Sequence, residues 1–307
     1  MNSDIFIKVF FAIVETFAFF GIGAFIVARK MLDQNSMKGM SRFAINVLTP
    51  FLIFSSVAGN FTKADLATAW IYPVLGFAMM ALHCIFGYLF LILRHNTAER
   101  KATFMHMAVV NNFLYLPLIV IGYLWDSKTI AALLLWSVGS TFGQWTIGIA
   151  VMAGSDMKKM LRTLISPNSI AVIVAILYIL LPFRFPERCM AFFAKTGSLA
   201  IPLCLIFIGA SIYLSRRKLS AHAGDVLFTT LIRVLVIPLL TLILLQYIPL
   251  PEMAHNIATV IAVMPASAGS VLIMREYGGD ADFAGQLIII TTIASLVTMP
   301  LLLAFSL

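Results

Sequence analysis

The sequence is poor in charged residues. Of its 307 residues 11% are charged, whereas 61% are hydrophobic. A soluble domain carries about 25% charged residues, which is enough to cover a globular surface. This shortage excludes an ordinary soluble domain. Together with the long apolar runs, it places the chain among polytopic membrane proteins.

The sequence also lacks groupings that perform covalent or metal chemistry. Its three cysteines, Cys84, Cys189 and Cys204, stand singly, so no pair has the spacing of a metal or redox site. The polar loops are short, and the sequence holds neither a Walker motif nor a nucleophile–His–acid arrangement. We therefore expect no cofactor, no enzyme activity and no ATP-driven transport by this chain alone.

Hydropathy predicts an all-α chain of ten membrane spans, at roughly 20 residues each. The predicted spans are 5–28, 41–59, 67–93, 103–123, 129–153, 167–182, 190–214, 226–248, 256–275 and 283–305. Lys and Arg cluster in alternate loops, as at Arg29-Lys30, Arg100-Lys101 and Arg216-Arg217, which the positive-inside tendency places in the cytoplasm. We therefore expect both termini outside, in a plasma membrane of the bacterial inner-membrane type. The net charge of +8 is assigned to these loops and not to nucleic-acid binding.

Two of the predicted spans are broken by polar and helix-breaking residues. The fourth contains Asn111-Asn112 ahead of Pro117, and the ninth contains Pro265 and the segment 267–270. In lipid, irregular backbone persists only inside protein or along a cavity. A matched pair of such breaks is typical of the substrate site of a secondary transporter. The candidate binding residues are therefore Asn111, Asn112, Pro117, Pro265, Ser267, Gly269 and Ser270.

The two halves of the chain also look related. The broken spans stand fourth in each set of five, and Leu48–Ser56 is similar to Ala200–Ile208. An odd number of crossings inverts the second copy relative to the first. The sequence thus predicts two five-helix repeats, 1–154 and 155–307, related by a pseudo-two-fold axis in the membrane plane.

A series of short motifs resembles the auxin efflux carrier family, which contains plant PIN auxin carriers and bacterial permeases for malate, malonate and similar acids. The motifs run over the whole chain in the family's order, and that order is more specific than any one motif. They are Asn46–Pro50, Asn112–Pro117, Arg233–Pro238, Met264–Ser267, Arg275–Asp280 and Thr291–Leu296, followed by Met299–Leu301. The long cytoplasmic loop of many plant members is absent, which favours a bacterial-type permease. Ser270 stands where the PIN carriers have a second proline.

The resemblance implies a specific architecture. Ten helices form a 5+5 inverted repeat in which the broken helices 4 and 9 cross near the midplane. Helices 1, 2, 6 and 7 form a scaffold that is often dimeric, and helices 3–5 and 8–10 form a transport unit that moves as in an elevator.

Isolated ionisable residues within spans are candidates for coupling or charge compensation. Glu15 is either a proton-coupling carboxyl or, as we favour from its place in the implied scaffold, a hydrogen-bonded carboxyl that holds scaffold helices together. Arg233 either snorkels to the cytoplasmic interface, which we favour, or faces an anionic substrate. His106 is either a packing residue or a proton carrier. Asn46 and Gln144 are candidates for polar lining.

The sequence therefore predicts a secondary active transporter of a small organic anion, such as malate, malonate or an auxin-like acid. An H⁺ gradient, a Na⁺ gradient or the substrate's own gradient would supply the energy. The expected partners are that anion, the lipid bilayer and a second copy of the chain. The alternative is a sodium symporter of the bile-acid type, which needs sodium ligands behind the crossing. A remote alternative is a membrane enzyme acting on lipids.

Overall fold

The computed structural model describes residues 3–91, 93, 97–152, 166–215 and 223–307. Within these residues the chain is helical apart from short connections and one isolated two-residue bridge. The predicted all-α fold is therefore confirmed. The predicted boundary between the repeats, at 154/155, lies outside the described residues.

The helices of the first half include one π-helical turn, η1. In chain order they are α1 (Ser3–Ala28), α2 (Gln34–Phe43), η1 (Ala44–Leu48), α3 (Thr49–Asn60), α4 (Lys63–Ala69), α5 (Ile71–Leu91), α6 (Ala98–Val109), α7 (Tyr115–Leu124) and α8 (Ser127–Ala150). The second half includes the π-helical turn η3. Its elements are α10 (Pro167–Leu180), α11 (Glu187–Ser198), α12 (Ala200–Ser215), α13 (Ala223–Leu231), η3 (Ile232–Val236), α14 (Ile237–Leu245), α15 (Glu252–Ala262), α16 (Ser270–Tyr277) and α17 (Ala281–Ser306).

Seven helical stretches of the described chain are long and apolar enough to cross a bilayer. They are Ser3–Ala28, Ser36–Asn60, Lys63–Leu91, Ser127–Ala150, Glu187–Leu214, Ala223–Leu245 and Ala281–Ser306. Three predicted spans do not form one long helix. The sixth is the 14-residue α10, and the fourth and ninth are each interrupted, between α6 and α7 and between α15 and α16.

Two continuous spans contain a π-helical turn directly ahead of a proline. A proline ring clashes with the carbonyl four residues earlier in an α-helix and supplies no N–H. The wider π turn relieves this conflict, and Thr49 and Ile237 donate to carbonyls five residues back, at Ala44 and Ile232. The turns η1 and η3 thus follow from Pro50 and Pro238, and η3 carries Arg233.

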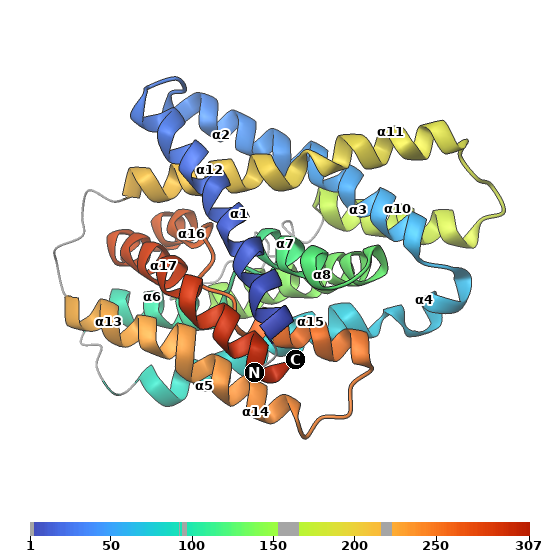
Figure 1. Ribbon diagram of the computed structural model, residues 1–307. Helices are drawn as coiled ribbons and strands as arrows, with labels where there is room; N and C mark the ends of the chain where they lie inside the picture. Colours follow the sequence, from blue (N-terminus) through green and yellow to red (C-terminus); the bar gives the residue numbers. More distant parts are fainter. Residues whose placement is uncertain (1–2, 92, 94–96, 153–165, 216–222) are drawn as a thin grey trace.

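The helices pack in two groups. In one, α1 lies along α12, and α3 packs on α10 and α11; in Figure 1 the helices α2, α3, α11 and α12 lie across the top. In the other, α5 packs on α8, and both α6 and α15 contact this pair. Helix α17 packs on α6, α13 and α16, and α14 packs on α15. Helix α1 also contacts α7 and α17, so it lies at the boundary between the groups.

Two glycines allow α1 and α12 to approach closely. A Cβ at Gly23 would collide with the carbonyl of Ile206, and a Cβ at Gly209 would collide with the backbone of Phe20. Small residues at helix crossings are typical of membrane proteins, where packing replaces the hydrophobic effect as the main attraction between helices.

Gly23→Ala should therefore lower the melting temperature of the purified protein, because overpacking costs about 1–3 kcal/mol. Gly21→Ala is the matched control on the same helix, since nothing lies within 4 Å of its Cβ position. Alanine is about 1 kcal/mol better than glycine inside a helix, so this control should be neutral or slightly stabilising. Thermal unfolding in detergent measures both variants. Equal melting temperatures would contradict the close packing of α1 on α12.

Candidate functional site

The two chain breaks meet and pair with each other. Asn111 and Ala266 form an antiparallel bridge, and the Asn112 N–H donates to the Pro265 carbonyl over 2.9 Å. The Ser267 N–H lies 3.4 Å from the carbonyl of Val110. Each break thereby satisfies backbone groups of the other, which lipid could not do. We call this meeting point, residues 110–114 and 263–269, the crossover.

Four half-helices end or begin at the crossover. The C-terminal ends of α6 and α15 enter it, and the N-terminal ends of α7 and α16 leave it. A helix N-terminus carries unpaired N–H groups and a partial positive charge, and a C-terminus carries the opposite. The crossover therefore brings two positive and two negative helix ends together.

The positive ends of α7 and α16 lack the usual compensation. Neither helix has a side-chain cap or an acidic residue in its first turn. By contrast, the described helices that start at a surface loop or at the N-terminus have a side-chain cap or an acidic residue there. The residues are Asp4, Asp33, Thr62, Thr97, Asp126, Ser166, Glu187, Asp225, Glu252 and Asp280. An uncapped N-terminus of this kind is suited to an anion.

Arg233 compensates the two negative ends. Its side chain is 1% exposed. Nη1 donates to the carbonyl of Ala108 over 2.8 Å, and Nη2 donates to the carbonyl of Met264 over 3.0 Å. Ala108 is in the last turn of α6, and Met264 follows the end of α15. The guanidinium thus joins the C-terminal ends of both half-helices, and the favoured prediction that Arg233 snorkels to the interface is wrong.

The two neighbouring asparagines have different environments. Asn111 is buried, and its Nδ2 donates to the carbonyl of Ile261 over 2.7 Å, which ties the first break to α15. Asn112 is half-buried, and its side-chain amide makes no hydrogen bond to the part of the chain that the structure describes. The Asn112 amide is therefore available to a ligand, whereas the Asn111 side chain is buried and one of its N–H donors is bound to Ile261.

The second break likewise contains both buried and accessible residues. Pro265 and Ser270 are buried, Ser267 is half-buried, and Gly269, the N-cap residue of α16, is exposed. Ser270 Oγ lies 3.2 Å from Nε2 of His106, whose Nδ1 lies 2.7 Å from the carbonyl of Gly148. The accessible polar groups of the crossover are therefore those of Asn112, Ser267 and Gly269. Pro117 is buried in the first turn of α7, where a missing N–H has no cost.

The sequence matches the family described as Membrane transport protein over residues 8–160 and 155–303, which together span nearly the whole chain. The chain belongs to this family, the auxin efflux carrier family. It is also 22% identical over 288 residues to an uncharacterized transporter of Methanothermobacter thermautotrophicus, covering 91% of this chain and 92% of that protein. The molecule is therefore a multi-pass membrane transport protein.

Glu15 of this auxin efflux carrier family member lies at the boundary between the two helix groups. The Tyr123 hydroxyl donates to Oε2 of Glu15 over 2.8 Å. Glu15 is thus hydrogen-bonded, as its structural interpretation expects. Its partner is at the end of α7, a part of helix 4, so this bond joins α1 to a helix outside the implied scaffold. The role of Glu15 in joining scaffold helices stays a prediction.

The two remaining candidates make no contact with the crossover that would assign them a role. Gln144 is half-buried on α8, one turn ahead of Gly148. Asn46 is exposed on η1. Their role as polar lining stays a prediction.

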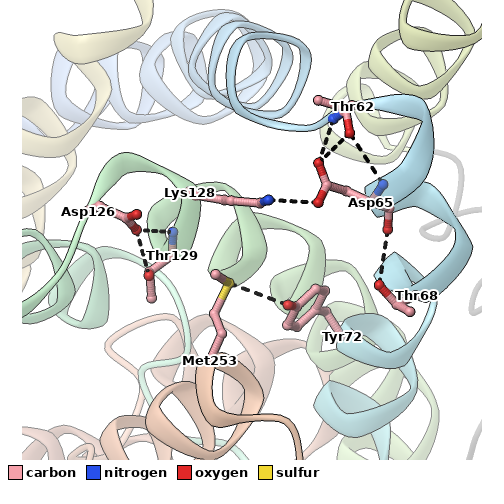
Figure 2. A network of polar contacts seen from close by, with 8 residues as sticks. All are labelled: Thr62, Asp65, Thr68, Tyr72, Asp126, Lys128, Thr129 and Met253. Carbon is pink, nitrogen blue, oxygen red and sulfur yellow. Dashed lines mark hydrogen bonds and ion pairs between the residues drawn. The ribbon is translucent and has the colours of Figure 1, made fainter.

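Two separate polar contacts join pairs of helices away from the crossover, as Figure 2 shows. Lys128 of α8 reaches Oδ1 of Asp65 on α4 over 2.6 Å. The Tyr72 hydroxyl lies 3.3 Å from the sulfur of Met253, in the first turn of α15. The Lys128–Asp65 ion pair thus holds α8 to α4, and the Tyr72–Met253 contact holds α5 to α15.

One apolar cavity lies between α3, α10 and α11. It has a volume of about 300 Å³ and is lined by residues such as Pro50, Phe54 and Phe193. Such a lining has no donor for an anion, so this cavity is not a candidate substrate site.

The contacts of Arg233 predict a large effect of its removal. Arg233→Met leaves the carbonyls of Ala108 and Met264 buried without donors, at about 1–3 kcal/mol for each group. The melting temperature of the purified Arg233→Met variant should fall clearly. The melting temperature of Arg233→Lys should fall less, because lysine keeps the positive charge. Arg184→Met is the matched control: Arg184 also donates to backbone carbonyls, at Leu181 and Tyr178, but it is exposed and water can replace it. A neutral Arg233→Met would contradict the compensating role.

Proposed function

We propose that this protein is a secondary active transporter of a small organic anion, a mono- or dicarboxylate such as malate, malonate or an auxin-like acid. The observation that supports the proposal best is the pair of uncapped half-helix N-termini at the crossover. Two partial positive charges meet there without an acidic side chain to balance them. A substrate carboxylate would supply the missing negative charge.

The accessible groups fit a carboxylate. The Asn112 side chain offers an N–H₂ group, Ser267 offers a hydroxyl, and the first turn of α16 offers backbone N–H groups next to exposed Gly269. Neutral donors bind an anion without a buried cation, which would be costly when the site is empty. Arg233 is turned to the carbonyl ends, so its charge supports the crossover and does not compete for the substrate.

We propose ten membrane helices in a 5+5 inverted repeat, in which α6–α7 form helix 4 and α15–α16 form helix 9. Matched acidic residues support the repeat. Asp65 and Asp225 are each the third residue of the helix that starts the third or eighth span, α4 or α13. Asp126 and Asp280 are the N-cap residues of the fifth and tenth spans, α8 and α17.

The two packing groups support an elevator mechanism, with α1, α2–α3, α10 and α11–α12 as a dimeric scaffold. The remaining helices would form the transport unit that carries the crossover. Polar contacts between the groups include the bond from Tyr123 to Glu15 and the 3.2 Å contact of Tyr115 with Thr49. Side-chain contacts of this kind can break and re-form as one group moves past the other.

Asn112 variants test the proposed site. A hydrogen bond to a charged group is worth about 1.5–3 kcal/mol, so Asn112→Ala should weaken carboxylate binding about ten- to over a hundred-fold. Asn112→Asp should weaken it more at neutral pH because it places a second anion beside the substrate. Part of this loss should return as the pH falls and the new carboxyl is protonated. Thermal-shift titration of the purified protein with a carboxylate panel measures these affinities.

Two variants serve as controls for this series. Ser267→Ala should have a smaller effect, because water can replace a neutral hydroxyl. Asn111→Ala should lower stability, because Asn111 donates to Ile261 within the protein. If Asn112→Ala and Asn112→Asp fold normally and bind the carboxylate like the wild type, the substrate site lies elsewhere.

We also propose a plasma-membrane location with both termini outside. The N- and C-terminal ends lie next to each other in Figure 1, and α1 packs against α17. In a variant without the three native cysteines, a cysteine at exposed Lys63 should react with an impermeant thiol reagent added to whole cells. A cysteine at exposed Lys101 should react only after lysis. The reverse pattern would show that the orientation is inverted.

A further inference from the structure

His106 is a buried titratable group placed directly behind the crossover. It is fully buried on α6, and its ring joins α8 to α16 through Gly148 and Ser270. Ser270 is the first residue of α16, whose uncapped N-terminus is half of the proposed anion site. The imidazole is thus one side chain away from the place where a carboxylate would bind.

The two contacts of the ring define its hydrogen-bond directions. The Gly148 carbonyl can only accept, so Nδ1, at 2.7 Å, carries a proton and donates. In the neutral ring Nε2 then has a lone pair, and the Ser270 hydroxyl donates to it over 3.2 Å. In this state the hydroxyl proton of Ser270 points at the histidine and is not available to a substrate.

Protonation of Nε2 reverses this bond. Nε2–H then donates to Ser270 Oγ, and the hydroxyl proton is released to turn toward the crossover. An extra positive charge next to the positive end of α16 is unfavourable on its own, and an anion at that end removes the cost. Anion binding and protonation of His106 therefore favour each other.

We propose that His106 is the site of the coupling proton, and that Ser270 links this proton to the substrate anion at the N-terminus of α16. The inference rests on the proposed anion-transport function and adds its coupling ion. One proton enters from water and adds to Nε2, and one carboxylate binds, so the pair moves through the membrane with one negative charge fewer than the anion alone. Gly269, next to Ser270, is exposed, so the N-terminal end of α16 lies at the surface of the described chain.

None of the other described ionisable groups around α6 is bonded to a ring nitrogen of His106, because Gly148 and Ser270 occupy Nδ1 and Nε2. Most of these groups lie at the helix ends, and Arg233 is held by Ala108 and Met264. The ionisable residues on α6 and the elements packed around it whose side chains the structure describes are Tyr72, His83, Cys84, Tyr88, Glu99, Arg100, Lys101, Lys128, Asp225, Arg233, Glu276, Tyr277, Asp282 and, at the N-cap of α17, Asp280. The side chain of Arg275 on α16 lies outside the described part.

A second buried histidine shows why the position matters. His83 on α5 is also fully buried, but its Nδ1 lies 3.5 Å from Nη1 of Arg233. A guanidinium has only donors, so a proton on Nδ1 of His83 would face the N–H groups of Arg233. A charge on His83 would also stand beside a fixed cation, whereas the ring nitrogens of His106 face a carbonyl and a hydroxyl.

Proton uptake on binding tests the proposal. Binding of a carboxylate from a panel that includes malate and malonate is measured by calorimetry in buffers of different ionisation enthalpy, at a pH where the ligand is fully ionised. The wild type should take up close to one proton per ligand, and its affinity should rise up to about tenfold for each pH unit of acidification between about pH 8 and 5. His106→Gln keeps donor and acceptor groups but cannot be protonated, so it should bind without proton uptake and with a flat pH profile.

Two further variants complete the experiment. Ser270→Ala keeps the histidine but removes the link, so it should bind the carboxylate more weakly and take up fewer protons per ligand. If His106→Gln does not fold, Ser270→Ala alone decides the outcome. His255→Gln changes a half-buried histidine on α15 away from the crossover and should keep wild-type proton uptake. Wild-type binding without proton uptake, or unchanged uptake in His106→Gln or Ser270→Ala, overturns the inference while anion transport stands. A panel in which no carboxylate binds overturns the proposed function, and this inference with it.

Discussion

The structure depends on one constraint: a helix that is broken inside a membrane must find partners for its backbone within the protein. Neither break can meet this requirement alone. The segment at Asn111 and Asn112 pairs with the segment at Pro265 and Ala266, which comes more than 150 residues later in the chain. The pairing explains why an apolar protein of this kind has two breaks and not one, and why both halves of the chain are needed to build the site.

The same pairing sets the electrostatics. Four helix ends converge, and the protein treats the two signs differently. The negative ends of α6 and α15 receive Arg233 as a permanent counter-charge. The positive ends of α7 and α16 receive neither an acid nor a cap, although the helix starts at the surface do. This arrangement supports the proposed anion site, because the cation is bound to carbonyls and the N–H groups stay open without a free buried charge.

The sequence predicts the all-helical fold and the two breaks because both depend on local properties: apolar length, and clusters of Asn, Pro, Gly and Ser. It does not predict the partners of Arg233. Counting from a span that starts at residue 226 places Arg233 near the interface, whereas α13 starts at Ala223 and the side chain turns inward to carbonyls far away in the chain. The sequence also does not distinguish the roles of Asn111 and Asn112, because the contact of Asn111 with Ile261 forms only on folding. Periodicity and depth are local, and tertiary contacts decide these roles.

The side-chain hydrogen bonds of the crossover lie within one of the two helix groups. Arg233, Asn111 and His106 bind to Ala108, Met264, Ile261, Gly148 and Ser270, all of which belong to helices of the proposed transport unit. The crossover can therefore move as one body without losing these bonds. Its links to the other helix group include two tyrosine hydroxyls of α7, at Glu15 and Thr49, and the packing of α1 on α7 and α17 and of α3 on α8. In the proposed elevator these interfaces would slide past each other, whereas the hydrogen bonds within the crossover keep the shape of the site.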